Sequence, residues 1–175
     1  MIMTVEELKR YISTGEEDSV LEAMLQALEL LIRKYTNNNF QDRNFRVVAD
    51  IASGIFLSDS DVRFKEGDTV QVSDSNYNKG LFTVKEPGLL SFKVKEETVD
   101  ELEVLVTKVV YPADVKIGVV NMLKYDLENR AKVGIQSETI SRHSVTYFDQ
   151  SASNTSIGYP VSLVGFLKPY MKARF

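Results

Sequence analysis

The sequence predicts an α+β protein, in which a small bundle of roughly three to four helices carries an inserted β domain and an extended arm before its last helix. In residues 1–44 and 109–175, apolar residues recur at helical spacing. Residues 45–108 instead show alternation and short β-branched runs between turn residues. The part at about 134–158 joins an alternating stretch to a polar loop, and we interpret it as the arm.

Two helices are expected before the insert. TVEELKRYIS predicts a short helix, in which Thr4 and Glu7 form a capping box and Gly15 marks the end. The acidic residues of EEDS then precede a longer helix, VLEAMLQALELLIRKY, and suit the positive end of its dipole. The expected buried face of this helix consists of Val20, Met24, Ala27, Leu28, Leu31 and Tyr35, widened by Leu21, Leu25 and Ile32.

The insert is expected to hold about five short strands. The apolar runs from which these strands are expected to form are FRVVADIA, GIFLS, DTVQVS, LFTVK, LSFKVK and ELEVLVTKVV. Because an open sheet of short strands would leave two exposed edges, we expect closure into a small barrel. The stretch FKEGDTVQVSDSNYNKGLFTVKE has the strand–loop–strand form of SH3-like barrels, with one turn at Gly67 and Asp68 and another at Asn78, Lys79 and Gly80.

Helical spacing returns after Tyr111 and Pro112. PADVKIGVVNMLKYDLENRAKV predicts a third helix, in which Gly118 either weakens the helix or lets another helix approach closely. The stretch PVSLVGFLKPYMKARF predicts a short last helix that Pro169 interrupts. The expected buried residues are Val115, Val119, Met122, Leu123, Leu127, Ala131 and Val133 in the third helix, and Val161, Val164, Leu167 and Tyr170 in the last.

Composition excludes several classes of protein. The chain has 175 residues, 43% of them hydrophobic, and no cysteine. Disulfide frameworks and thiolate metal sites are therefore excluded. No apolar run approaches the roughly 18 residues that span a bilayer, so we expect no membrane association. The first residues lack the basic and apolar regions of a signal peptide.

Charge is unevenly distributed along the chain. Residues 1–44 hold 5 Lys and Arg against 8 Asp and Glu, residues 45–108 hold 8 against 12, and residues 109–175 hold 8 against 5. The net charge of −4 argues against nucleic-acid binding. The opposite sign of the last part is either chance surface composition or an indication that the ends of the molecule meet different partners, or each other, in an assembly.

Residues that could carry a reaction are scarce. His143, the one histidine, stands in VGIQSETISRHSVTYFD, and a hydrolase would need a serine or threonine nucleophile beside it. The sequence has no GxSxG elbow and no GxGxxG or GxxxxGK[ST] phosphate loop. The acidic residues of DSDVRFKEGD do not fall at EF-hand positions. We therefore expect no enzyme activity, no cofactor, and no catalytic, metal or cofactor-binding residues.

Three stretches outside the insert carry sequence motifs that follow one another in a fixed order. The first is TVEELKRYI followed by EEDSVLEAMLQALELLIRKYTNNNF, with its closing Tyr-Thr-x-x-x-Phe. The second is PADVKIGVVNMLKYDLENR leading into the Gly-x-x-Ser-Glu of VGIQSETISRHSVTYFD, and the third is GYPVSLVGFLKPYMKARF with its Leu-x-x-Tyr-x-x-x-Arg. This series resembles the head–tail connector (adaptor) proteins of long-tailed bacteriophages. The resemblance covers residues 1–44 and 109–175; simpler members have a short loop in place of the insert.

The resemblance implies a structural virion protein. It would form a homo-oligomeric ring of about twelve copies under the portal protein, at the head–tail junction, after synthesis in the cytoplasm of the host bacterium. The ring would extend the DNA channel and offer a platform for the next neck or tail-completion protein. DNA would pass through without sequence-specific binding, because an acidic bore repels it.

Two segments are the expected contact sites of such a ring. The arm is expected to cross to the neighbouring subunit, because an alternating strand with neither face wholly apolar suits a partner better than a monomer core. The aromatic and basic end is expected to dock on the portal, so that deleting residues 166–175 abolishes portal binding without unfolding the helices. The arm residues are Ile135, Ile140, His143, Val145, Tyr147 and Phe148, and the portal-docking residues are Phe166, Lys168, Tyr170, Lys172, Arg174 and Phe175.

Two other functions remain open at this point. The insert resembles SH3/KOW-like barrels, so the chain could be a nucleic-acid- or protein-binding module; its acidic balance favours protein. A hydrolase using His143 would lose its activity in His143→Ala, a substitution that we expect to be nearly silent. The aromatic residues near the end of the chain could equally complete the core.

Overall fold

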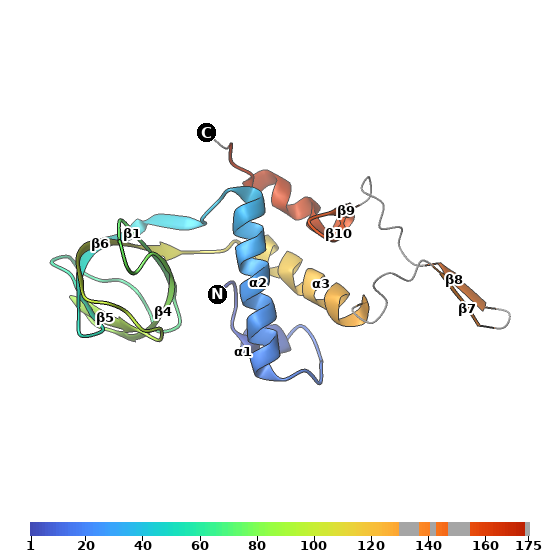
Figure 1. The fold of residues 1–175 in the computed structure, drawn as a ribbon, viewed down its shortest axis with the longest axis horizontal. Helices are drawn as coiled ribbons and strands as arrows, with labels where there is room; N and C mark the ends of the chain where they lie inside the picture. Colours follow the sequence, from blue (N-terminus) through green and yellow to red (C-terminus); the bar gives the residue numbers. More distant parts are fainter. Residues whose placement is uncertain (130–136, 141–142, 147–154, 174–175) are drawn as a thin grey trace. The chain divides into compact units, whose positions relative to one another are not determined.

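The computed structural model describes residues 1–129, 137–140, 143–146 and 155–173. The chain forms two compact units: a barrel unit, Met1 with Asn39–Val110, and a helical unit, Ile2–Asn38 with Tyr111–Phe175 (Figure 1). The predicted α+β class is therefore confirmed. The barrel unit begins before residue 45 and ends after residue 108, because its first strand already starts at Gln41 and its last strand runs to Val109.

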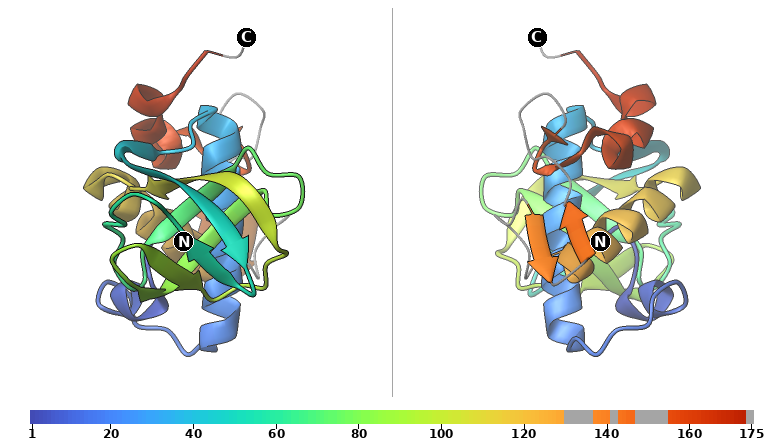
Figure 2. Two further views of the ribbon diagram at one scale, coloured as in Figure 1. Left: turned by 90° about the vertical axis from the view of Figure 1, so that its left-hand side faces the viewer. Right: turned by 90° about the vertical axis from the view of Figure 1, so that its right-hand side faces the viewer.

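Six antiparallel strands close the barrel, in the order β1-β2-β5-β4-β3-β6 (Figure 2). Closure was predicted correctly, whereas the expected number of about five strands was too low. Closure also removes the two exposed edges that an open sheet would have had. The strands are β1 (Gln41–Ala52), β2 (Ile55–Leu57), β3 (Thr69–Ser73), β4 (Gly80–Pro87), β5 (Ser91–Val94) and β6 (Glu101–Val109).

A two-residue turn joins β1 to β2. Ser53 and Gly54 both have positive φ, 51° and 77°, as a type I′ hairpin requires. The turn sets the register, in which Ala52 pairs with Ile55 and Asp50 with Leu57. β2 ends at Leu57, so it pairs with only the last residues of the much longer β1.

Aromatic rings fill the barrel core. Phe56 stacks on Phe92 with 4.6 Å between ring centroids, and Phe64 meets Phe92 edge-on at 5.2 Å. The alternation of FRVVADIA holds as expected: Val47, Ala49 and Ile51 are buried and the residues between them are exposed. The barrel unit thus has a hydrophobic core of its own.

The helical unit is built from the two ends of the chain. Thr4 caps α1 as predicted, with its Oγ1 accepting from the N–H of Glu7 at 3.1 Å. The helix ends at Lys9 rather than at Gly15, because the N–H of Arg10 already turns back to the C=O of Glu7. The helices and short strands of this unit are α1 (Val5–Lys9), α2 (Asp18–Thr36), α3 (Ala113–Asn129), β9 (Thr155–Ser156), β10 (Tyr159–Pro160), α4 (Val161–Val164) and the 3-10 helix η2 (Gly165–Tyr170).

The buried face of α2 differs from the prediction. It is centred on Leu21, Leu25, Leu28 and Ile32, which were expected only to widen the face or to share it, and it also includes Glu29 and Arg33. Ala27, expected to be buried, is exposed. The two charged residues lie inside because the hydroxyl of Tyr111, far along the chain, forms hydrogen bonds with both of them.

Gly118 lies where α3 meets the C-terminal segment. Val115, Val119, Met122 and Leu123 are buried as predicted. A Cβ atom on Gly118 would lie 2.2 Å from Cζ of Phe166, so the ring packs directly against the glycine. Of the two interpretations of Gly118, the one in which another segment packs closely against the glycine is therefore confirmed.

A hairpin lies in the segment predicted as the arm. β7 (Ser137–Ile140) and β8 (His143–Thr146) pair antiparallel, with Ile140 opposite His143 and Ser137 opposite Thr146. The segment was expected to be one extended strand. It folds back on itself instead, so that its two halves satisfy part of each other's backbone hydrogen bonding.

Across the described ranges, no helix combines the length and the apolar character that crossing a membrane demands.

Candidate functional site

The C-terminal segment, residues 159–173, is part of the core of the helical unit. Leu167 is 0% exposed and Val164 is buried, as predicted, but Val161 is 39% exposed and does not share their face. Phe166 is half-buried against Gly118. Deleting residues 166–175 would therefore remove a core side chain, so we expect this deletion to destabilise the helices as well, unlike the expectation drawn from the sequence.

Tyr170 joins this segment to the start of α3. Its hydroxyl donates to the carboxylate of Asp114, with both oxygens at 2.8 Å. This hydrogen bond raises the pKa of Tyr170 above its ordinary value. The backbone C=O of Tyr170 accepts from Nδ2 of Asn38 at 3.1 Å, so the residue also contacts the chain just after α2.

The residues after η2 cover the C-terminal end of α2. The N–H of Lys172 donates to the C=O of Thr36 at 2.8 Å, and Nδ2 of Asn37 donates to the C=O of Ala173 at 2.8 Å. Asn37 is itself in the left-handed conformation typical of a helix end. The backbone of this segment is therefore committed to the helical unit.

Of the four predicted portal-docking residues that the structure describes, two are exposed. The side chains of Lys168 and Lys172 face solvent, whereas those of Phe166 and Tyr170 contact other residues of the helical unit. Arg174 and Phe175 lie outside the described residues. That the end of the chain binds a partner stays a prediction, which concerns the exposed lysines.

Of the predicted arm residues, Ile140, His143 and Val145 lie in the β7–β8 hairpin, whereas Ile135, Tyr147 and Phe148 lie outside the described residues. Within the part of the chain that the structure describes, β7 and β8 pair only with each other.

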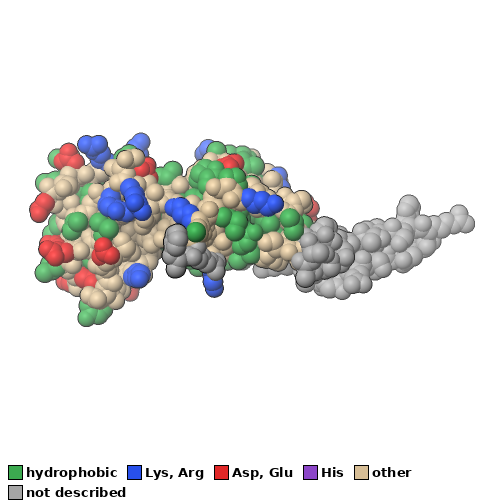
Figure 3. Space-filling model, turned by 90° about the horizontal axis from the view of Figure 1, so that it is seen from above, with side chains coloured by type: hydrophobic (Ala, Val, Ile, Leu, Met, Phe, Trp, Pro, Cys, Tyr) green, Lys and Arg blue, Asp and Glu red, His purple; other side chains and the backbone are tan. Residues whose placement is uncertain are grey.

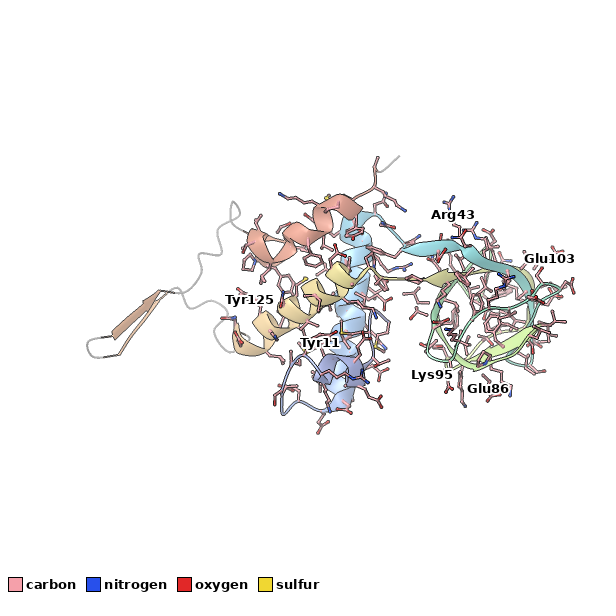
Figure 4. The ribbon with its side chains drawn as sticks, turned by 180° about the vertical axis from the view of Figure 1, so that it is seen from behind. Tyr11, Arg43, Glu86, Lys95, Glu103 and Tyr125 are labelled. Atoms are coloured by element: carbon pink, nitrogen blue, oxygen red, sulfur yellow. The ribbon has the colours of Figure 1, made fainter. Side chains whose placement is uncertain are left out.

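Both ends of the arm are fixed to the helical unit. It leaves from α3, which ends at Asn129, and the chain returns through β9 and β10. Tyr159 in β10 donates its hydroxyl to Oδ2 of Asp126 at 2.6 Å, and its ring lies 6.0 Å from that of Tyr125, near the end of α3 (Figure 4). Burial, more than this hydrogen bond, raises the pKa of Tyr159. The β7–β8 hairpin therefore lies, in sequence, between two segments that are anchored in the helical unit.

A buried polar cluster on α2 was missed by sequence reasoning. The hydroxyl of Tyr111 donates to Oε1 of Glu29 at 2.7 Å and accepts from Nη1 of Arg33 at 3.4 Å. Burial raises the pKa of Tyr111 well above its ordinary value. The signal available was the spacing, since Glu29 and Arg33 stand four residues apart and directly follow Leu28 and Ile32 of the apolar face.

On the barrel unit, Glu101 organises the loop between β3 and β4. Its carboxylate accepts from Oγ of Ser75 at 2.5 Å, from the N–H of Asn76 at 2.5 Å and from Nδ2 of Asn78 at 2.9 Å. These bonds, led by that from Ser75, lower the pKa of Glu101 from its usual 4.5 to about 2. The braced loop holds Tyr77 73% exposed.

The low pKa of Glu101 predicts a pH-dependent effect of Glu101→Gln. Because the folded-state pKa is depressed, the ionised carboxylate stabilises the barrel above pH 4.5, and this contribution is lost as the pH falls toward 2. Urea titrations at pH 7 should find the variant less stable than the native chain, and at pH 3 the difference should be smaller. Glu97→Gln, an exposed carboxylate on the same unit, serves as the control. An equal difference at both pH values would contradict the role of the charge.

Among the described residues, no three His, Cys, Asp or Glu side chains are grouped closely enough to hold a metal ion. A scan against models of known protein families finds no match, and a search of curated protein sequences finds no relative.

Proposed function

We propose that the chain is a head–tail connector of a long-tailed bacteriophage, a structural virion protein that assembles as a ring of about twelve copies under the portal. The helical unit would be the connector bundle, and the barrel would be an SH3-like insert within it. The ring would join the filled capsid to a neck or tail-completion protein, and DNA would pass through its channel. The protein would be made in the cytoplasm of the host bacterium and would act in the virion.

The β7–β8 hairpin is the observation on which this proposal chiefly rests. An isolated two-stranded hairpin is marginally stable in water, and within the described residues these two strands have only each other. A third strand or a groove on a neighbouring subunit would stabilise it. In a ring, every subunit both offers and receives such an element, so one kind of contact closes the assembly.

Arm contact is assigned to Ile140, His143 and Val145 of the hairpin, with Ile135, Tyr147 and Phe148. These apolar and aromatic side chains suit the buried centre of an interface. His143 would act here as one interface residue among several and not as a base, so His143→Ala should change no chemical activity.

The portal is the proposed partner of the C-terminal segment. The exposed side chains of Lys168 and Lys172, followed in sequence by Arg174 and Phe175, give this end a positive charge beside an aromatic residue. Phe166 and Tyr170 support it from within the helical unit, where they contact Gly118 and Asp114. The segment would therefore present a rigid basic surface instead of a free tail.

The test reverses the two exposed charges. The double variant Lys168→Glu, Lys172→Glu should bind the isolated portal ring of the same phage about tenfold more weakly or worse, because the lost contact is repeated at every subunit. The helices should stay folded by circular dichroism. The control is Lys85→Glu with Lys95→Glu, two exposed lysines of the barrel unit. Unchanged binding by the first double variant would contradict the docking assignment.

A further inference from the structure

A hollow of about 770 Å³ lies on the wall of the barrel unit. Such a volume is within the range of ordinary ligand-binding sites. One side of the hollow is β1 from Arg46 to Asp50, and the facing side is the chain at Leu57–Ser60 together with Leu90. Glu103 and Leu105 of β6 complete it. Glu103 lies on the barrel unit in Figure 4, and its N–H donates to Oδ1 of Asp50 at 2.8 Å.

The hollow runs along the backbone edge of β1. Successive side chains of a strand point to opposite faces, so a hollow on one face would be lined by every second residue. Here all five consecutive residues 46–50 line it, both the exposed Val48 and the buried Val47 and Ala49. A hollow lined by both the outward-pointing and the inward-pointing residues must follow the backbone of the strand.

Strand pairing explains why this edge is open. On one side, β6 pairs with β1 at residues 46–49. On the other, β2 pairs with β1 at residues 50–52 and no further. Beyond Leu57 the chain turns away, because the N–H of Ser58 donates to the C=O of Leu90 at 2.9 Å and that of Val62 to the C=O of Leu89 at 2.7 Å. Residues 46–49 therefore have no second strand partner among the described residues.

The open edge presents backbone donors and acceptors. In an antiparallel ladder, alternate residues direct their N–H and C=O groups to the same side. Ala52 flanks the two-residue turn and bonds toward β2, and so does Asp50. Val48 and Arg46, two and four residues earlier, therefore direct their N–H and C=O groups toward the hollow. We call this element the β1 seam, defined by residues 46–49 and the facing residues 57–60 and Leu90.

Side chains around the β1 seam combine apolar surface with negative charge. Val48, Leu57 and Leu90 are 55%, 48% and 49% exposed, large fractions for aliphatic side chains that lie together. The charged residues that line the hollow are Arg46, Asp50, Asp59 and Glu103, three carboxylates against one guanidinium. Nε of Arg46 donates to Oγ1 of Thr107 at 3.0 Å. Figure 3 shows acidic, basic and hydrophobic side chains intermingled on one face of the barrel unit.

We propose that the β1 seam binds an extended peptide segment of a partner protein, which adds as a strand beside residues 46–49. The backbone of the segment would pair with Val48 and Arg46, as in other cases of strand addition to an open edge. Val48, Asp50 and Leu57 lie on the same outer face of the barrel wall. The side chains of the segment on this face, every second residue, would therefore include apolar residues against Val48, Leu57 and Leu90 and basic residues facing Asp50, Asp59 and Glu103. At about 3.4 Å per residue, the seam accommodates a segment of roughly five residues.

The acidic rim decides between this occupant and a nucleic acid. Phosphate groups would meet three carboxylates and a single arginine, so binding would be repulsive and would not gain from counterion release. A basic, alternating peptide gains both from the open backbone groups and from the charge.

The first measurement needs no ligand. In the full chain, amide hydrogen exchange followed by NMR should be fast at Val48, whose N–H faces the seam, and slow at Val106, which is buried in the neighbouring strand β6. Slow exchange at Val48 in the chain alone would mean that the seam is already closed, and it would overturn the proposal.

The second measurement uses a capped octapeptide, Lys-Thr-Val-Thr-Lys-Thr-Val-Thr, in which the lysine and valine side chains lie on the same face of a strand. Titration should shift the amide signals of residues 46–50, 57–60 and 90 and slow exchange at Val48. The same peptide with glutamate in place of both lysines should bind about tenfold more weakly, and the lysine–valine peptide N-methylated at alternate positions should lose a similar factor, since each lost contact amounts to one or two hydrogen bonds or ion pairs. Equal binding of all three peptides, or shifts elsewhere on the chain, would overturn the proposal.

A matched pair of variants locates the site. Leu57→Lys removes apolar surface and charge complementarity at the seam, and should weaken the lysine–valine peptide about tenfold. Leu102→Lys makes the same change at a leucine that is 73% exposed and does not line the hollow, and should leave binding unchanged. No difference between the variants would contradict the assignment. Shifts of the seam amides on adding octauridylate would assign the seam to a nucleic acid, and shifts on concentrating the chain alone would assign it to a second copy; either result overturns the partner peptide.

Discussion

Replacing Phe92 with alanine is expected to lower the free energy of unfolding of the barrel unit by about 3–5 kcal/mol. Phe92 is 1% exposed, stacks on Phe56 and meets Phe64 edge-on, so its loss leaves a cavity between two other rings. A closed barrel cannot collapse easily around such a cavity, because each of its six strands pairs with a neighbour on both sides over at least part of its length. The effect is large compared with the usual stability of a domain.

Hydrogen exchange measured on peptide fragments would locate the effect of Phe92→Ala. Fragments from β2, β4 and β5 should exchange faster, while fragments from α2 and α3 should change little, because the buried contacts of these helices lie in the helical unit. The control is Leu89→Ala, a leucine of the same unit that is 70% exposed. If the two variants lost equal protection, the assignment of Phe92 to the barrel core would be wrong.

Leu167→Ala is expected to destabilise the helical unit by about 2–5 kcal/mol. Leu167 is fully buried in η2, next to the point where Phe166 packs on Gly118. A loss of this size would show that the C-terminal segment belongs to the folded core, so that portal binding must be tested with surface charges and not by truncation. Urea unfolding followed by circular dichroism measures it.

Val161→Ala supplies the matched control for Leu167→Ala. The sequence pattern expects both residues to be buried, whereas Val161 is 39% exposed. Its replacement should cost under about 1 kcal/mol, since little apolar area returns to water. A cost similar to that of Leu167→Ala would favour the sequence pattern over the observed packing.

The barrel could be predicted from the sequence because its signal is local. Alternation in FRVVADIA fixes which side chains of β1 point inward, and the Ser53–Gly54 turn fixes the register of its hairpin with β2. The early end of β2 could not be predicted, since it depends on hydrogen bonds from Ser58 and Val62 to residues about thirty positions away. The open β1 seam is a consequence of those bonds.

The helical unit was predicted less well for a related reason. Glu29 and Arg33 lie inside because Tyr111, far along the chain, binds both of them. Helical spacing predicts the buried face from the hydrophobic residues alone and takes no account of a distant hydrogen-bonding partner. The predicted buried face of α2 was therefore rotated by a fraction of a turn from the observed one. The close approach at Gly118 was predicted correctly, because glycine destabilises a helix and its presence there indicates that another segment packs closely against it.

The candidate site, too, was predictable from the sequence only in part. The basic and aromatic end was recognised in composition, but composition could not separate Lys168 and Lys172, which are exposed, from Phe166 and Tyr170, which contact the helical unit. The alternation around His143 predicted strand structure correctly at Ser137–Ile140 and His143–Thr146. The fold-back between β7 and β8 lacks a strong turn signal in the sequence, and one long strand and a hairpin share the same alternation.

The central claim is that this chain assembles as a ring on a portal, and the mass of the complex tests it most directly. The purified chain should be measured by native mass spectrometry, alone and after mixing with the portal ring of the same phage. We expect the mixture to gain the mass of about twelve copies of the chain, and the gain to fall sharply with the Lys168→Glu, Lys172→Glu variant. A mixture in which the portal ring keeps its own mass and the chain stays separate would contradict the account.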